Sequence, residues 1–228
     1  MQVRDRKVRG IDLHLARLNE GSRALFGVDM EDDRILQRIR HALGDDIRDA
    51  SLRVYVLGTE FEHELSVMVT VREPASMPRA PRSLQTVGYQ RPLAHIKHVG
   101  GFAQAYYGRM ADENGFDEAL FVAPDGVIAE GSITNIGFVE GDTVVWPDAP
   151  ALHGISMQVL ERELTGTGLA WQRRTVNVSD ISSFEGAFIT NARGIAPVGR
   201  IDQTIMPTGS ELLSTVTRLF DAAPWDPI

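Results

Sequence analysis

Lysine is nearly absent from this sequence, and one lysine stands where its chemistry could be used. The 228 residues contain only Lys7 and Lys97, and arginine supplies the other basic side chains apart from histidine. A lysine can act as an amine nucleophile once its neighbours lower its pKa, whereas an arginine keeps its proton. Lys7 lies in a charged run near the terminus, which is typical of solvated surface. Lys97 lies between two histidines in residues 95–102. It is either an ordinary lysine at the end of a strand or an amine that is positioned to form a Schiff base.

The composition excludes several classes of protein. A net charge of −8 provides no basic patch for the phosphates of a nucleic acid, so no nucleic-acid partner is expected. The chain has no cysteine, which excludes disulfides, thiol chemistry and cysteine–zinc sites, and no metal is predicted. The sequence has no apolar run long enough to cross a bilayer and no signal-peptide pattern. We therefore predict a cytoplasmic, membrane-free protein.

Hydrophobic spacing predicts two α/β domains, one small and one larger and richer in strands. Helical spacing is found in five segments, at residues 12–26, 30–43, 102–114, 157–165 and 210–220, and Asp12 is the expected N-cap of the first. Alternation or short apolar runs predict strands at residues 51–57, 64–71, 118–122, 136–139, 143–146, 171–178, 187–190 and 197–201. Residues 84–94 resemble a link, so the predicted domains are 1–93 and 94–228.

Three further segments carry side chains that could bind a small anionic ligand. Glu130 and Asn135 stand at the two ends of a turn that follows a predicted hairpin. At such a place Glu130 could also be an ordinary surface residue. Ser156 follows Gly154-Ile155 at the start of a predicted helix and could be a plain N-cap. Arg17 has apolar neighbours on a predicted helix, so it either extends to solvent or reaches an anion.

Taken in this order, the segments resemble the class IV, fold-type IV pyridoxal-phosphate enzymes. That family includes branched-chain aminotransferases, D-amino-acid aminotransferase and aminodeoxychorismate lyase. The resemblance covers about residues 12–202 and implies the family's two-domain α/β (α+β type) fold. It makes Lys97 the amine that binds pyridoxal 5′-phosphate as a Schiff base and later transfers protons. It makes Glu130 the carboxylate that keeps the pyridine nitrogen protonated.

The resemblance also implies how the rest of the cofactor is held. Its phosphate contacts fall on one residue of the small domain and on two segments of the large one: Arg17, Ile155, Ser156, Thr190 and Asn191. Leu152 is the apolar residue expected to pack on the ring. Ser156 stands where the family usually has threonine, and this exchange keeps the hydroxyl group.

The substrate end is less determined by the resemblance. A carboxylate substrate needs a cation or backbone donors, and we name Arg193 and His98 as candidates, although a lone histidine is more often structural. Phe102 stands where branched-chain enzymes have a tyrosine that bonds the cofactor. Family members usually carry further residues before the Arg17 helix, so we expect a small domain that is truncated at its N-terminus.

The predicted activity is transfer of an amino group between an amino acid (or amine) and a 2-oxo acid. The resemblance further implies a homodimer. Two alternatives stay open: a lyase similar to aminodeoxychorismate lyase, and a trimmed paralogue without catalysis. Pyruvate release would distinguish the lyase, and failure to bind the cofactor would distinguish the paralogue.

Overall fold

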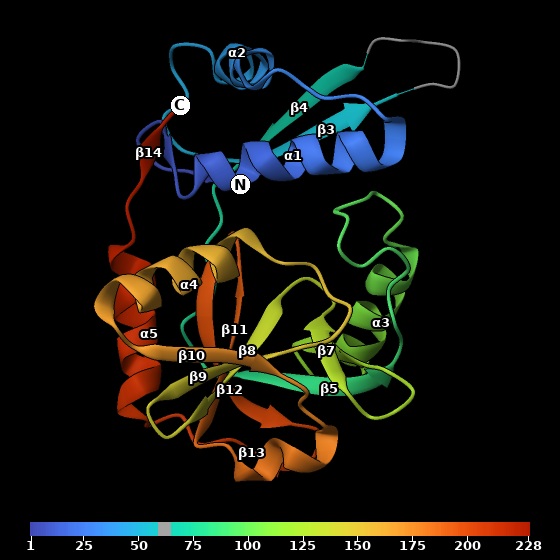
Figure 1. The fold of residues 1–228 in the computed structure, drawn as a ribbon, viewed down its shortest axis with the longest axis vertical. Coiled ribbons are helices and arrows are strands. Elements are labelled where there is room, and N and C mark those ends of the chain that lie inside the picture. The colour runs from blue at the N-terminus through green and yellow to red at the C-terminus, as the bar shows by residue number, and fades with distance from the viewer. Residues whose placement is uncertain (59–64) are drawn as a thin grey trace. The chain divides into compact units, whose positions relative to one another are not determined.

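The computed structural model describes residues 1–58 and 65–228 and divides the chain into two compact units (Figure 1). The small unit combines residues 1–76 with residues 224–228, and the large unit is residues 77–223. The division thus falls before the boundary predicted at residues 93 and 94. The reason is β5 (Arg82–Gly88), which lies in the expected link but pairs with both β12 (Gly194–Ile201) and β6 (Glu118–Val122). Its buried Leu84 and Val87 join the core of the large unit.

The small unit contains the first two predicted helices, α1 (Ile11–Phe26) and α2 (Asp32–Leu43). Its antiparallel sheet has the order β1 (Gln2–Val3), β3 (Ala50–Leu57) and β4 (Ser66–Arg72), while β2 (Lys7–Val8) pairs with β14 (Asp226–Pro227). The predicted strand at 64–71 is confirmed from residue 66, and its first residue lies outside the described part. Buried side chains from both helices and β3 form one core, among them Leu15, Ile35, Ile39, Leu43 and Leu52.

The start of α1 differs from the prediction because the cap comes from the other end of the chain. Asp12 was the expected N-cap, but Gly10 holds that position in the left-handed conformation, with φ at 63°. The carboxylate of Asp226 accepts hydrogen bonds from the N–H groups of Gly10 at 3.1 Å and Ile11 at 3.3 Å. A carboxylate at a helix N-terminus is favourable because it meets unpaired donors and the positive end of the helix dipole.

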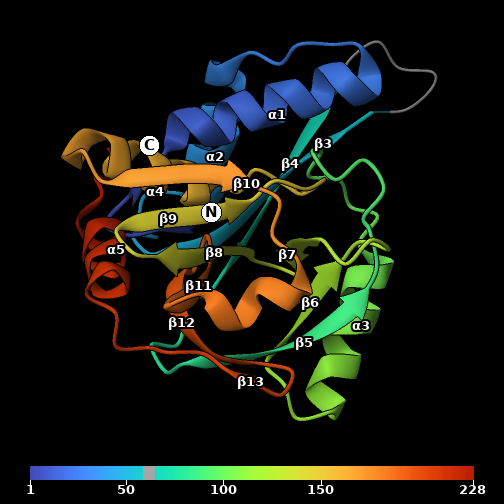
Figure 2. The same cartoon turned by 60° about the horizontal axis from the view of Figure 1, so that its bottom comes forward.

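A large mixed sheet forms the centre of the other unit, as Figure 2 shows. Its remaining strands are β7 (Ile128–Gly131), β8 (Asn135–Glu140), β9 (Thr143–Pro147), β10 (Ala170–Arg174), β11 (Gly186–Asn191) and β13 (Thr204–Ile205). The order is β10-β9-β8-β11-β12-β5-β6-β7, with β13 paired to β12. The pairs β9–β10, β5–β12 and β5–β6 are parallel, and the others are antiparallel.

The central strands are buried on both faces. On β11, Ala187 and Ile189 belong to one core, while Phe188 between them belongs to a second core beneath α4 (Ile155–Thr167) and α5 (Glu211–Ala222). The 3-10 helix η1 (Val178–Ser183) covers the first core, and α3 (Phe102–Glu113) packs on β6. This burial explains why β11 is a nearly continuous apolar run rather than an alternating one.

Candidate active site

Glu130 is a buried carboxylate on β7 with a partner on each oxygen. It is 6% exposed, so the alternative of a surface glutamate is wrong. The Nε atom of Arg91 donates to Oε1 at 2.9 Å, and the N–H of Leu152 donates to Oε2 at 3.1 Å. A buried charge is tolerated only when it is paired and hydrogen-bonded. The fold therefore places the Glu130 carboxylate, paired with Arg91, inside the large unit.

Leu152 and the loop that leads to α4 are held from both sides by the predicted motif. Asn135, the first residue of β8, donates from Nδ2 to the carbonyl of Leu152 at 2.6 Å, while Glu130 binds the N–H of the same residue. Gly154 lies so close to this amide that a Cβ atom would stand 2.0 Å from Oδ1 of Asn135. Glycine is required at this position because no side chain could be accommodated. Leu152 itself is 9% exposed.

The N-terminus of α4 meets the turn between β11 and β12. Ser156 is not the N-cap, because the helix begins at Ile155, Gly154 is the cap residue, and no side chain caps the first turn. The hydroxyl of Ser156 instead donates to the carbonyl of Asn191 at 2.7 Å. The first N–H groups of a helix lack intrahelical partners and favour an anion. This end of α4 can therefore accept a phosphate beside Asn191.

The predicted contacts on the β11–β12 turn are not equivalent. Thr190 is fully buried, and its hydroxyl donates to the carbonyl of Gly194 at 3.1 Å. Direct contact with a phosphate would require this bond to be given up, so Thr190 lies beneath the turn. Asn191 is half-buried and accepts the N–H of Arg193 at 2.8 Å. The side chain of Arg193 is exposed.

Lys97 lies in the loop between β5 and α3 and is exposed in the single chain. The carbonyl of Ile96, the preceding residue, accepts a hydrogen bond from Nη1 of Arg91 at 2.8 Å. His98 has one ring nitrogen 3.0 Å from the carbonyl of Pro92, and the other accepts the N–H of Gly100 at 3.1 Å. Both ring nitrogens of this substrate candidate are thus used within its own loop.

His153, another histidine near the predicted site, is held by charged neighbours. Its Nε2 atom is 2.7 Å from Glu161, and Arg173 donates to the other oxygen of that carboxylate at 2.8 Å. Burial raises the pKa of Glu161, but the hydrogen bonds and charges of His153 and Arg173 outweigh it and place the pKa below its ordinary value. These contacts anchor the loop before Gly154 to α4.

Glu118 is a second buried carboxylate that spacing did not reveal. On β6, its Oε1 atom accepts hydrogen bonds from the N–H of Ile133 at 2.7 Å and from the hydroxyls of Thr134 at 3.0 Å and Ser132 at 3.4 Å. Burial raises the pKa of Glu118, and these hydrogen bonds oppose the rise only in part. Glu118 therefore supports the turn between Glu130 and Asn135.

Replacing Glu118 by glutamine is expected to raise thermal stability at neutral and alkaline pH. The folded chain binds this proton more tightly than the unfolded chain does, so the contribution to stability is complete below the unfolded-state pKa. It is lost as the pH rises through the raised pKa. Glutamine keeps the accepting oxygen and carries no charge, so it escapes this loss.

Melting temperatures measured between about pH 4 and about pH 9 test the sign of this linkage. We expect the wild-type and Glu118→Gln proteins to have the same melting temperature at the acid end of this range. At higher pH the variant should melt at a higher temperature, by about 2–4 °C for each kcal/mol of difference in the free energy of unfolding. A glutamine variant that is less stable at alkaline pH would contradict the assigned role.

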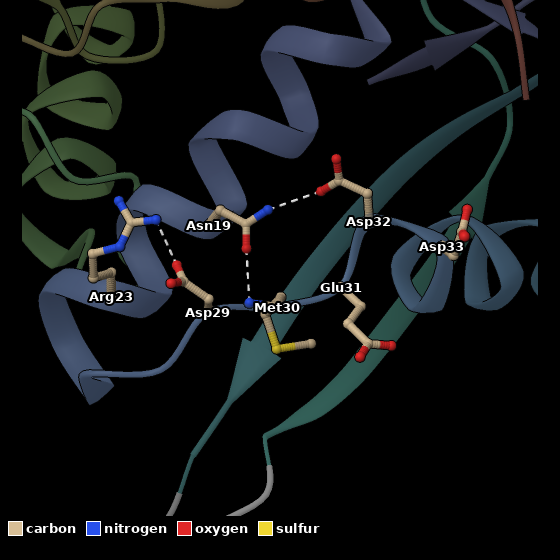
Figure 3. A pocket seen from close by; sticks show the side chains of 7 residues that line it. All are labelled: Asn19, Arg23, Asp29, Met30, Glu31, Asp32 and Asp33. Carbon is tan, nitrogen blue, oxygen red and sulfur yellow. Dashed lines mark hydrogen bonds and ion pairs between the residues drawn. The ribbon is translucent and has the colours of Figure 1, made fainter.

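Arg17 lies on α1 of the small unit and is half-buried. The same unit has a polar hollow at the connection of α1 to α2, shown in Figure 3, where Asn19 bonds both Asp32 and the N–H of Met30. Arg23 there pairs with Asp29. These contacts join the two helices, and we assign no ligand to the hollow.

The residues of the large unit suit the predicted cofactor. A carboxylate, an uncapped helix N-terminus, a turn with an asparagine and a loop with a lysine are connected by the hydrogen bonds described above. Of the described residues, no group of three histidines or carboxylates is placed to bind a metal ion. No helix within residues 1–58 and 65–228 has the length and apolar character to span a membrane.

Fold and site together define the class, which is a mixed α/β protein with the fold-type IV architecture. A structure called a hypothetical aminotransferase from Mycobacterium tuberculosis, in its PLP-bound form, aligns with a TM-score of 0.86 at 21% identity, over 97% of this chain and 86% of that one. A putative 4-amino-4-deoxychorismate lyase from Legionella pneumophila aligns with a TM-score of 0.87 at 18% identity, over 98% and 89%.

Sequence comparison then gives the family. A probable branched-chain-amino-acid aminotransferase from Rickettsia bellii is 28% identical over 63% of this chain, and the match spans only 55% of that relative. The model of the amino-transferase class IV family matches residues 1–201. The chain belongs to the class IV aminotransferase family, which confirms the predicted family and fold.

Proposed function

We propose that this protein is a pyridoxal-phosphate-dependent aminotransferase that exchanges an amino group between an amino acid and a 2-oxo acid. The main support is the hydrogen-bonded network that joins Glu130, Leu152 and, through Arg91, the segment of Lys97. These residues are far apart in sequence, and family membership gives the arrangement its chemical meaning.

In this proposal each part of the site has one task. When bound, the cofactor would supply an aldehyde that reacts with amines and a ring that accepts electrons from the substrate carbon. Lys97 provides the attaching amine and afterwards moves a proton at the substrate carbon. Glu130 holds a proton on the pyridine nitrogen by its negative charge, and Leu152 packs on the ring.

The phosphate is proposed to bind at the N-terminus of α4, through the N–H groups of Ile155 and Ser156. The hydroxyl of Ser156 would also bind it, in exchange for its bond to the carbonyl of Asn191. Asn191 contributes from the adjacent turn, with Thr190 as support beneath it. Arg17 would add a guanidinium from the small unit. For the substrate carboxylate, we retain Arg193 as a candidate because its side chain is exposed beside Asn191, and we keep His98 as the second.

A homodimer is part of the proposal. Val99 and Phe102, beside the Lys97 loop, are 80% and 83% exposed, and the ring of Phe102 stacks on Tyr106 with a centroid distance of 6.3 Å. Exposed apolar side chains in one place are typical of an interface. We expect light scattering to give the mass of two chains. The cytoplasmic location of the protein remains a prediction.

The experiment is a half-reaction with the purified protein and added cofactor. An amino acid should convert the bound aldehyde form to the amine form, seen as loss of the visible absorbance band, and a 2-oxo acid should restore it. Because one structural neighbour, the hypothetical aminotransferase from Mycobacterium tuberculosis, also has an alpha-ketoglutarate and PMP bound form, 2-oxoglutarate is the first acceptor to test. A protein that shows no band with excess cofactor would contradict the proposal.

The lyase is the second candidate, because a putative 4-amino-4-deoxychorismate lyase has the same fold over nearly the whole chain. It would share the lysine and the carboxylate and differ in the bond that breaks. Pyruvate release from aminodeoxychorismate, without amino transfer to a 2-oxo acid, would favour it.

A further inference from the structure

Arg91 connects the carboxylate of Glu130 with the backbone that precedes Lys97. Its side chain is 3% exposed, and each of its three nitrogen atoms has a partner. Nε donates to Oε1 of Glu130 at 2.9 Å, Nη1 donates to the carbonyl of Ile96 at 2.8 Å, and Nη2 donates to the carbonyl of Ala94. No cofactor contact in the proposed function uses this arginine.

The loop that Arg91 binds lies between β5 and α3, and two of its side chains, Ala94 and Ile96, are buried. Residues 91–101 form turns and bends without a helix or strand. Leu93 has φ at 47°, a conformation that residues other than glycine rarely adopt, so contacts elsewhere in the loop must maintain it. The bonds of His98 to Pro92 and Gly100 stay within the loop. Arg91 therefore connects this loop to the carboxylate of Glu130 on β7.

We propose that Arg91 is a positioning residue that sets the place of the Lys97 backbone relative to the Glu130 carboxylate. The proposal rests on the proposed function, in which amine and carboxylate act on different atoms of one ring. A planar guanidinium with several donors fixes both partners at once, which a single ammonium cannot do. A displacement of about 1 Å between reacting groups can cost about 10²-fold in rate.

Four variants test this role in the full chain. Arg91→Met removes all three hydrogen bonds. Arg91→Lys keeps the positive charge but lacks the planar guanidinium group with its several donors. The double variant Arg91→Met with Glu130→Gln removes both charges, so that no unpaired carboxylate is left buried if the single variant folds poorly. Arg82→Met is the matched control, because Arg82 makes one ion pair to Asp117 at 2.9 Å and lies at the start of β5, the strand that precedes this loop.

The first measurement is amide hydrogen exchange of the cofactor-free protein. We expect exchange across residues 93–100 to become about tenfold faster or more in Arg91→Met and in the double variant, since the loop loses its anchor. Arg91→Lys should protect the loop only in part, and Arg82→Met should leave it unchanged. Unchanged exchange in the folded Arg91→Met protein, or complete recovery by lysine, would overturn the proposal.

The second measurement uses the holoenzyme. We expect Arg91→Met to lower kcat by about 10²-fold, to weaken cofactor affinity and to shift the pH at which the visible band changes, while the KM for the amino donor changes little. An altered KM with normal kcat and spectrum would count against positioning. If the wild-type protein binds no cofactor, the proposed function fails, and hydrogen exchange still decides whether Arg91 holds the loop.

Discussion

Lys97→Ala is expected to abolish covalent attachment of the cofactor and to lower amino transfer by about 10⁴-fold, at the upper end of what a positioned acid–base group contributes. Alanine provides no amine, so nothing in the variant can bind the aldehyde at this place or move the proton at the substrate carbon. Cofactor should still associate through its phosphate, because the donors at α4 are unchanged.

The composition of the chain makes this experiment unusually direct. Lys7 is the sole other lysine of the sequence, and it lies on β2 with its side chain exposed. Borohydride reduction followed by peptide mass analysis should place the cofactor on Lys97 in the wild-type protein and in the control Lys7→Ala. A cofactor mass on Lys7, or normal turnover in Lys97→Ala, would contradict the assigned role.

Glu130→Gln is expected to keep covalent attachment but lower kcat by about 10²–10³-fold, the usual loss when one preorganised electrostatic group is removed. Glutamine has a similar shape but no negative charge, so it cannot hold the pyridine nitrogen in its protonated form. Its amide group would also present a donor to either Arg91 or the N–H of Leu152, both of which donate to Glu130.

Stability must be separated from chemistry in this variant. Breaking a buried ion pair costs about 3–5 kcal/mol, so the cofactor-free protein should melt earlier. Turnover should therefore be expressed per bound cofactor. Glu140→Gln is the matched control, because Glu140 ends β8 on the surface and pairs with Arg174 at 2.6 Å. Equal turnover of Glu130→Gln and wild type would contradict the role of the carboxylate.

Sequence reasoning predicted the helices and most strands because their hydrophobic period is local. The apolar spacing of residues 12–26 and 210–220 gave α1 and α5 with ends close to those observed. It missed β5. This strand pairs with β12 and β6, which are both distant in sequence, so no adjacent hairpin indicates it. The N-cap predictions were also wrong for α1 and α4. The carboxylate of Asp226, from the other end of the chain, binds the N-terminus of α1, and Gly154 is the cap residue of α4 without a side-chain cap.

The sequence by itself determined which residue types are present: one lysine in a nearly chargeless loop, a Glu-Gly-x-x-x-Asn motif and a Gly-Ile-Ser turn, and from these the family. Tertiary structure alone decided that Glu130 is buried, that Thr190 lies beneath its turn, and that Arg91 joins the carboxylate to the lysine loop. The physical reason is that burial and hydrogen bonding depend on strands brought together from distant parts of the chain, whereas motif and periodicity are properties of neighbouring residues.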